Sequence, residues 1–239
     1  MSSAAIYGHR GARGEAPENT IAGFAHALNI GVAGLETDIA LTADLVPVLH
    51  HDPDLPDGRL IRHTKFAALP GIPTLAAALA AFPHTNWLLE LKTFPAHPEK
   101  SHPPEPLVTA TRAAIAASGI ATSQVSILAF DWSVLREVTR QAPNLNRACL
   151  TAPNTEAEPN LWWGTSSPAS TPQAVAATGA TAWAAFHATL TASNIAQARA
   201  LGLKIYAWTV NDPGEFQRLA PLVDVIITDH PTRFIPPRR

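Results

Sequence analysis

Short runs of β-forming residues recur along the 239-residue chain with helical patterns between them, and this alternation limits the possible folds more than any other feature. The eight candidate strands span residues 4–8, 34–39, 87–91, 125–129, 147–150, 181–185, 204–208 and 224–228. Strands that alternate with amphipathic helices form right-handed units around a parallel sheet. Eight strands in a chain of this length predict a closed (β/α)8 barrel of the TIM type rather than an open doubly wound sheet.

Start and stop residues mark the ends of several predicted helices. Helix starts are expected at Thr74, Asp131 and Asp212. Glu215 is placed to complete a capping box at the last of these starts. Helix stops are expected at Gly119, Gly179 and Gly202. Residues 41–52 predict a short hairpin inserted after the second strand, and the absence of an internal repeat or boundary predicts a single domain over residues 1–239.

Charge and composition exclude several classes of protein. The chain has 17 Lys and Arg residues against 19 Asp and Glu residues, a net charge of -2 that provides no basic surface for nucleic acid or an acidic membrane. Its one cysteine, Cys149, cannot form an internal disulfide. Neither an export signal nor an apolar run long enough for a membrane span is found. We therefore expect a cytoplasmic protein without stable membrane association, either a monomer or a homodimer.

Nine of the 22 prolines lie in two segments, residues 94–106 and 153–172. Both segments follow candidate strands, and proline interrupts regular structure, so we expect them to be loops at the carboxyl-terminal face of the barrel. The second segment contains Trp162 and Trp163. These two rings either form a wall of a substrate pocket or pack to hold the loop in place.

Polar side chains lie where the candidate strands end, which is where TIM-barrel active sites are built. They are His9, Arg10, Glu36, Asp38, Glu90, Lys92, Asn211 and Asp229. Glu36 and Asp38 are two positions apart on one strand and therefore point to the same face, and Glu90 ends the next strand. Three converging carboxylates favour a hard cation such as Ca²⁺ or Mg²⁺. The alternative is a structural ion network with Arg10 and Lys92.

Two histidines are the residues that phosphodiester cleavage needs when no strong nucleophile is present. One withdraws a proton from the attacking hydroxyl and the other protonates the departing oxygen. His9 ends the first strand, and either His50 or His51 is placed to supply the second imidazole. Arg10 and Lys92 can neutralise phosphate oxygens.

Seven short motifs in a fixed order carry a family resemblance through most of the chain. The motifs are His9-Arg10-Gly11, Ala16-Pro17-Glu18-Asn19-Thr20, Glu36-Thr37-Asp38 followed by Thr42 and Asp44, Pro47-Val48-Leu49-His50-His51-Asp52, Leu89-Glu90-Leu91-Lys92, Trp208-Thr209-Val210-Asn211 and Ile227-Thr228-Asp229-His230-Pro231. In order and spacing they resemble the glycerophosphodiester phosphodiesterase family. The resemblance implies a (β/α)8 barrel of the phospholipase C-like phosphodiesterase type, a Ca²⁺ or Mg²⁺ ion, and hydrolysis of a small glycerophosphodiester to glycerol 3-phosphate and an alcohol.

The resemblance also assigns roles to individual residues. The acid and base pair it implies is His9 and His51, with His50 as a neighbour. The metal ligands it implies are Glu36, Asp38 and Glu90. The phosphate-binding residues are Arg10 and Lys92, and the glycerol or leaving group is bordered by Trp208 and Phe130. In such a reaction the glycerol 2-hydroxyl attacks phosphorus first and gives a cyclic phosphate that water opens.

Departures from the family pattern keep two other interpretations open. Only 39 positions separate His51 from Glu90, so we expect a small cap over the site. The family usually has Ser-Phe in the middle strand, where this chain has Ala129-Phe130. The motifs therefore constrain the type of reaction more tightly than the identity of the leaving group. One alternative is a related phosphodiesterase that acts on lysophospholipids or sugar phosphodiesters. The other is a non-catalytic barrel that binds a phosphate ligand.

Overall fold

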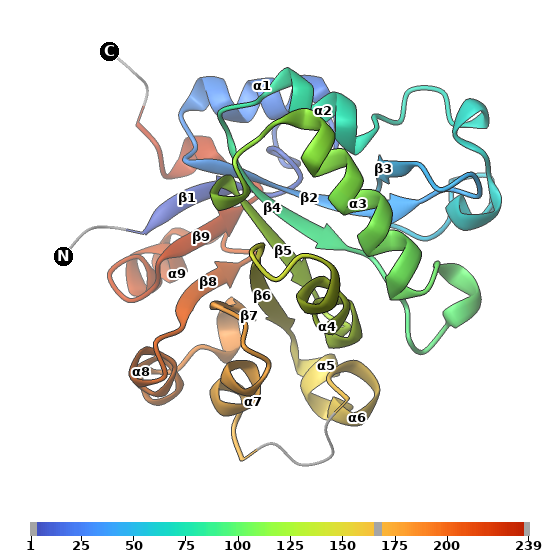
Figure 1. Cartoon of the computed structure of the whole chain (residues 1–239). Helices are drawn as coiled ribbons and strands as arrows, with labels where there is room; N and C mark the ends of the chain where they lie inside the picture. The colour runs from blue at the N-terminus through green and yellow to red at the C-terminus, as the bar shows by residue number, and fades with distance from the viewer. Residues whose placement is uncertain (1–3, 165–168, 237–239) are drawn as a thin grey trace.

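Eight parallel strands close on themselves to form the barrel in the computed structural model, which describes residues 4–164 and 169–236 (Figure 1). The strands are β1 (Ala5–Gly8), β2 (Gly34–Leu41), β4 (Asn86–Leu91), β5 (Val125–Ala129), β6 (Asn146–Thr151), β7 (Ala182–Phe186), β8 (Lys204–Trp208) and β9 (Val225–Thr228). Strand β1 closes the barrel because it pairs in parallel with both β2 and β9. The predicted (β/α)8 barrel is therefore confirmed.

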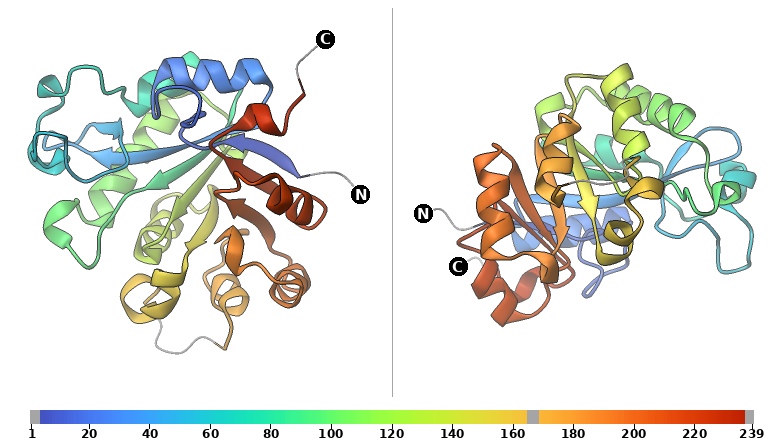
Figure 2. Two further views of the ribbon diagram at one scale, coloured as in Figure 1. Left: turned by 180° about the vertical axis from the view of Figure 1, so that it is seen from behind. Right: turned by 90° about the horizontal axis from the view of Figure 1, so that it is seen from below.

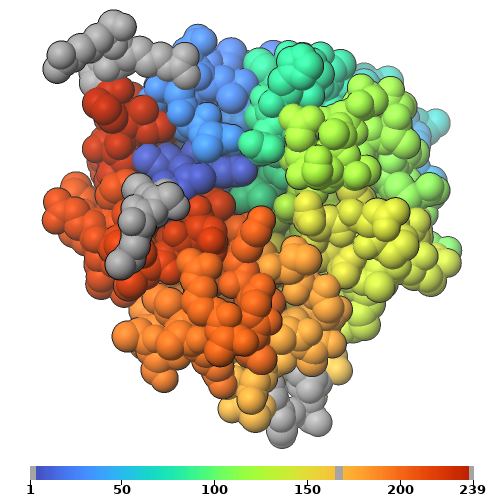
Figure 3. Space-filling model, turned by 60° about the vertical axis from the view of Figure 1, so that its left-hand side comes forward, coloured from blue at the N-terminus to red at the C-terminus, as the bar shows by residue number. Residues whose placement is uncertain are grey.

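The helices lie on the outside of the barrel (Figures 1 and 2). They are α1 (Ile21–Ile30), α2 (Leu75–Ala81), α3 (Pro104–Ser118), α4 (Trp132–Gln141), α5 (Pro153–Ala157), α6 (Pro159–Trp162), α7 (Thr171–Ala177), α8 (Ala192–Ala200) and α9 (Pro213–Leu219). In the space-filling view, the blue amino-terminal part lies directly against the red carboxyl-terminal part (Figure 3). This contact follows from the pairing of β1 with β9.

Side chains alternate between the inside of the barrel and the layer beneath the helices. The inner cluster contains Leu88, Leu128, Leu150 and Ile227, among others. The outer cluster includes Leu35 and other residues on the opposite faces of the same strands. This alternation is the two-residue period of a β-strand, and in a barrel both faces are buried. Residues that share the inner face near the strand ends therefore point into the mouth of the barrel.

The predicted hairpin after β2 is present. Strand β3 (Pro47–Leu49) pairs antiparallel with the end of β2, with Val48 opposite Ala40. The chain then continues to residue 74 before α2 begins. A small separate apolar cluster holds this insertion against the barrel, and it consists of Ala40, Val48, Leu55, Ile61 and Leu69. The hairpin places residues 50–52 beside the mouth of the barrel.

The predicted helix starts are confirmed by side-chain caps. Each cap accepts a hydrogen bond from a backbone N–H in the first turn, and the caps are Thr74, Asp131 and Asp212. The expected capping box at Asp212 is incomplete, because the Glu215 carboxylate binds Arg218 and His187 instead of returning to the cap. The predicted stops of α3, α7 and α8 coincide with left-handed glycines at Gly119, Gly179 and Gly202.

The prediction that both proline-rich segments are loops is wrong in part. Helix α3 begins at Pro104, and α5 and α6 begin at Pro153 and Pro159. Proline suits the first turn of a helix, because its fixed φ is helical and its missing N–H would have no partner there. Residues 165–168 of the second segment lie outside the described residues.

Replacing Phe24 by alanine should lower the free energy of unfolding by about 3–5 kcal/mol. Phe24 on α1 is fully buried, with its ring 5.2 Å from Trp87 and 6.3 Å from Phe82, so truncation leaves a cavity between helix and barrel. Urea unfolding followed by circular dichroism measures the change. Leu201→Ala is the control, because Leu201 is exposed and its truncation should change stability by less than about 0.5 kcal/mol. Equal midpoints for the two variants would contradict this packing.

Candidate active site

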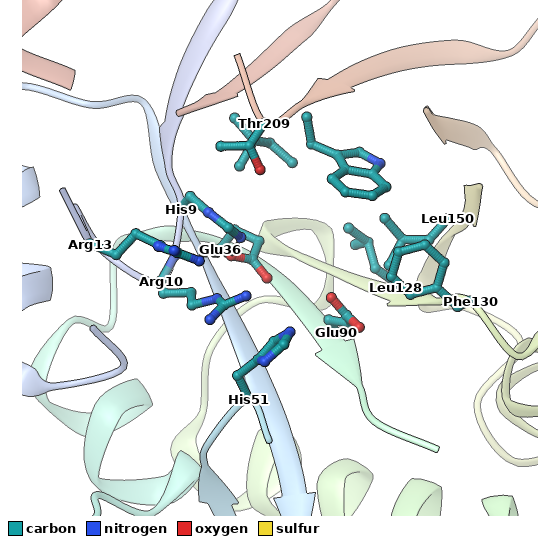
Figure 4. Close-up of a pocket in the computed structure, with 12 residues that line it drawn as sticks. His9, Arg10, Arg13, Glu36, His51, Glu90, Leu128, Phe130, Leu150 and Thr209 are labelled. Carbon is teal, nitrogen blue, oxygen red and sulfur yellow. Dashed lines mark hydrogen bonds and ion pairs between the residues drawn. The ribbon is translucent and has the colours of Figure 1, made fainter. Parts of the chain in front are cut away.

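A cavity of about 300 Å³ opens at the carboxyl-terminal ends of the barrel strands (Figure 4). It is lined by His9, Arg10, Arg13, Glu36, His51, Glu90, Leu128, Phe130, Leu150, Trp208, Thr209 and Ile227. Leu128, Leu150 and Phe130 lie together on one side of the cavity, and most of the charged side chains gather on the other, with Glu90 between the two groups (Figure 4). The cavity thus has a polar half and an apolar half.

The strand register brings three carboxylates together at the polar side. Asp38 on β2 lies opposite Glu90 on β4, and Glu36 occupies the same face of β2. One oxygen from each carboxylate lies within 4.8 Å of the others. Glu36 and Asp38 are almost completely buried, at 3% and 1% exposure. Oxygen ligands in this arrangement suit a hard divalent cation such as Ca²⁺ or Mg²⁺.

Two cationic side chains neutralise only part of this charge. Arg10 Nε lies 3.1 Å from Asp38 Oδ2, and Lys92 Nζ lies 2.7 Å from Glu90 Oε1 and 3.6 Å from Asp38 Oδ1. The ion pairs expected under the structural alternative are therefore present. Asp38 Oδ1 nevertheless has no hydrogen-bond partner among the described residues, although it is buried. An orphaned carboxylate oxygen facing two other carboxylates fits a cation ligand.

Glu36 is the member of the cluster that forms no ion pair with a lysine or arginine among the described residues. It accepts a hydrogen bond from the Arg10 backbone N–H at 3.0 Å, and His9 Nε2 lies 3.8 Å away. Burial and the neighbouring charge of Asp38 raise the pKa of Glu36 to about 8. Burial opposes the charge of Asp38 as well, but Lys92 and Arg10 hold the pKa of Asp38 below its ordinary value. A third positive charge would stabilise the ionised cluster.

Asp229, which follows β9, holds His9, which follows the neighbouring strand β1. His9 Nδ1 lies 2.6 Å from Asp229 Oδ1, and this contact leaves Nε2 toward the cavity. Burial disfavours the imidazolium, but the hydrogen bond to Asp229 and the charge of Glu36 outweigh it and raise the pKa of His9. A carboxylate on one ring nitrogen orients the imidazole for proton transfer at the other.

His51 has the same kind of partner as His9. Its Nδ1 lies 2.7 Å from Asp52 Oδ1, and its side chain is 35% exposed. Its neighbour His50 contacts the backbone carbonyl of Asp52 and is absent from the described lining of the cavity. The structure therefore brings His9, His51, Glu36 and Glu90 to one cavity and directs His50 elsewhere. Asp38 belongs to the same carboxylate cluster but is absent from the described lining of the cavity.

The apolar half of the cavity includes both predicted aromatic residues. The rings of Phe130 and Trp208 meet edge to face with their centres 5.4 Å apart. The Trp208 indole N–H donates to the Ala184 carbonyl at 3.0 Å, which fixes the ring. Trp162 contacts the outer side of Phe130, with ring centres 6.5 Å apart. These contacts give the cavity a rigid wall.

The structure bears on the two roles left open for Trp162 and Trp163 and on the expected place of Lys92. The described lining of the cavity contains neither Trp162 nor Trp163. Trp163 is buried and stacks on Trp132 of α4 at 4.6 Å, so it holds the loop in place. Lys92 is likewise absent from that lining, because its ammonium is turned toward Asp38 and Glu90. The sequence does not reveal these directions, which depend on how neighbouring elements dock.

Several residues at the site had no predicted role. Arg13 lines the cavity, Asp229 binds His9, and Asn211 donates to Asp229 at 2.7 Å. Asn19 donates to Asp38 at 3.0 Å, and Glu18 pairs with Arg10. All of these residues except Arg13 belong to the motifs that carry the family resemblance, and this membership is the sequence feature that points to them.

The barrel and its cavity define a TIM-barrel protein with a buried carboxylate cluster beside two carboxylate-bound histidines. The model of the glycerophosphoryl diester phosphodiesterase family matches residues 9–59 and 57–233. The chain therefore belongs to this family, as the sequence motifs predicted.

Solved structures of known proteins share the fold. A protein from Silicibacter pomeroyi that is assigned as a glycerophosphoryl diester phosphodiesterase superimposes with a TM-score of 0.86 at 30% identity, covering 97% of this chain and 92% of that chain. A phosphodiesterase from Oleispira antarctica was solved in complex with the product sn-glycerol-3-phosphate. It superimposes with a TM-score of 0.80 at 21% identity over 97% of this chain and 95% of that one.

A shorter match links the chain to a mouse protein. Glycerophosphodiester phosphodiesterase domain-containing protein 4 from Mus musculus is 56% identical over 50 residues, which are 21% of this chain. The alignment spans only 8% of the mouse protein's length. Within residues 4–164 and 169–236, no helix combines the length and the apolar character that crossing a membrane requires.

Replacing Asp229 by asparagine should lower the pKa of His9. The carboxylate currently stabilises the imidazolium through a 2.6 Å contact, and a neutral amide removes that charge. Nuclear magnetic resonance titration of the histidine side chains measures the change. Glu215→Gln is the matched control, because it removes a carboxylate from His187 and should leave His9 unchanged. An unaltered His9 titration in the Asp229 variant would show that this contact does not set its pKa.

Proposed function

We propose that this protein hydrolyses glycerophosphodiesters to glycerol 3-phosphate and an alcohol with the help of a divalent cation. The observation that carries the proposal is the meeting of His9, His51, Glu36 and Glu90 at one cavity, with Asp38 in the same carboxylate cluster. Membership of the family supports the reaction, and the product bound to the Oleispira antarctica relative supports glycerol 3-phosphate as the product.

The cation would be held by the three carboxylates Glu36, Asp38 and Glu90. Their oxygens suit Ca²⁺ or Mg²⁺, and Asp38 Oδ1 has no hydrogen-bond partner among the described residues. A bound cation supplies positive charge that stabilises a phosphate oxygen. Lys92 contributes by balancing the charge of Asp38 and Glu90, which replaces its expected direct contact with phosphate.

The two histidines would carry the proton transfers. One accepts the proton of the glycerol 2-hydroxyl as its oxygen bonds to phosphorus and the bond to the leaving alcohol breaks. The other donates a proton to the departing oxygen. Water then opens the cyclic phosphate with the two roles exchanged. Asp229 and Asp52 hold His9 and His51 so that the second nitrogen of each ring is available for these transfers.

The remaining lining residues would bind the substrate. Arg10 and Arg13 place guanidinium groups at the polar half, where they can neutralise phosphate oxygens. Phe130 and Trp208 form the wall against which the carbon skeleton packs. A cavity of about 300 Å³ matches the size of a small headgroup diester. An acyl chain would extend beyond it, so we favour deacylated substrates over lysophospholipids.

Release of glycerol 3-phosphate from the choline, ethanolamine, glycerol and inositol diesters tests the activity directly. We expect release with Ca²⁺ or Mg²⁺ and none with chelator. His51→Ala should lower turnover by roughly 10²–10⁴-fold because one proton transfer is lost. His84→Ala, at an exposed position, is the control.

Three outcomes of that assay would contradict the proposal. Faster turnover of lysophosphatidylcholine, included as a fifth substrate, would favour the lysolipid interpretation. Binding of the diesters without release would favour a non-catalytic barrel. Wild-type rates in the His51 variant would remove His51 from the mechanism.

Glu36→Gln should abolish the stabilisation of the protein by Ca²⁺ or Mg²⁺, which raises the unfolding temperature of the wild type by mass action. With chelator present, burial raises the pKa of Glu36 from 4.5 to about 8, so the folded state binds the extra proton between these values. Wild-type stability should therefore fall as pH rises through this window, and the variant should lack this contribution.

Thermal and urea unfolding at several pH values measure both effects. Glu99→Gln is the control, because Glu99 is exposed. A wild-type cation shift that persists in Glu36→Gln would remove Glu36 from the ligand set.

A further inference from the structure

Two asparagines hold Thr-Asp pairs at the site in the same way. Asn19 Nδ2 donates to Asp38 Oδ2 at 3.0 Å. Asn19 Oδ1 accepts from the Thr37 hydroxyl at 2.7 Å and from the Asp38 backbone N–H at 3.4 Å. One side chain therefore binds the carboxylate, the backbone and the preceding hydroxyl together.

The second asparagine repeats these three contacts. Asn211 Nδ2 donates to Asp229 Oδ2 at 2.7 Å. Asn211 Oδ1 accepts from the Asp229 backbone N–H at 2.9 Å and from the Thr228 hydroxyl at 3.1 Å. The same atoms occupy the same positions in both groups.

The barrel topology explains the repetition. Asn19 lies between β1 and α1 and contacts β2, and Asn211 lies between β8 and α9 and contacts β9. In each case a loop that follows one strand returns to the next strand of the sheet. The asparagine and its aspartate are 19 positions apart in the first group and 18 in the second. Strands β2 and β9 are the two neighbours of β1, and His9 is the first residue after β1 (Figure 1).

The contacts leave each amide only one orientation. Because Oδ1 already accepts from two donors, the amide nitrogen must face the carboxylate. Each amide then binds Oδ2 of its aspartate and leaves Oδ1 for the site. Asp38 Oδ1 lies 3.6 Å from Lys92 Nζ, which also contacts Glu90 of the carboxylate cluster, and Asp229 Oδ1 contacts His9 Nδ1 at 2.6 Å.

We propose that Asn19 and Asn211 are positioning residues. Each binds Oδ2 of its aspartate, so that Asp38 Oδ1 is the oxygen that contacts the cation and Asp229 Oδ1 is the oxygen that contacts His9. The cation half rests on the proposed function. The two asparagines act on separate parts of the reaction, since one serves cation binding and the other serves the imidazole. Loss of each should consequently have a different effect.

Two variants separate these roles. Asn19→Gly removes the amide and retains a residue that tolerates the left-handed backbone of this position, where φ is 54°. Asn211→Ala removes the second amide. Asn86→Ala is the matched control, because Asn86 is an exposed asparagine at the amino-terminal end of β4. Thr37→Val and Thr228→Val remove one anchor of each amide and serve if a first variant does not fold.

Three measurements are made on each variant. Calorimetric titration with CaCl₂ and with MgCl₂ gives the cation Kd. The downfield proton resonance of His9 Nδ1–H reports the hydrogen bond to Asp229. Turnover of a glycerophosphodiester at saturating cation gives kcat.

Asn19→Gly should raise the cation Kd by about 10-fold or more and leave the His9 resonance in place. Asn211→Ala should lower kcat by about 10-fold or more and lose the His9 resonance, with the cation Kd unchanged. The same changes in cation Kd, His9 resonance and kcat in both variants would overturn the proposal. Changes of this size in Asn86→Ala would overturn it as well. Wild-type protein that binds no cation would overturn the Asn19 half. Wild-type protein that releases no product would refute the proposed function, and the resonance would still decide the Asn211 half.

Discussion

Burial of three carboxylates at the mouth of the barrel is the constraint on which the rest of the site depends. Asp38 and Glu90 face each other across β2 and β4, with Glu36 on the same face. Removing such charges from water costs several kcal/mol for each ion unless partners compensate. Arg10 and Lys92 supply two partners, and a cation bound by the three oxygens would supply the third. The buried carboxylates are thus stabilised by positively charged partners.

The loop after β1 is shaped by this requirement. Its backbone must bring both the Arg10 side chain and the Asn19 amide into contact with Asp38. Arg10 and Asn19 both have left-handed backbone, with φ of 49° and 54°, a conformation that costs energy for residues other than glycine. On the other side of β1, Asp229 holds His9 next to Glu36. Strand β1 and the loop after it therefore place the His9 imidazole beside the carboxylate cluster.

Features with a local cause were predictable from the sequence. The eight strands follow the apolar runs because both faces of each strand are buried, and the caps at Thr74 and Asp131 follow from side chains that bond the first helical turn. Both proline-rich segments were misjudged, since proline also begins helices, as at Pro104. The direction of Trp163 depends on the docking of the segment after α6 against α4, which no local pattern encodes.

The sequence by itself determined the fold class, the family and the residue types gathered at the strand ends, because strand and helix periods and motif order are properties of neighbouring residues. Only the tertiary structure decided that Lys92 turns toward Glu90 and which oxygen of Asp229 meets His9. These choices depend on strand register and on loops that return to distant strands. The contact between His9 and Asp229 joins residues 220 positions apart, so it exists only once the barrel has closed.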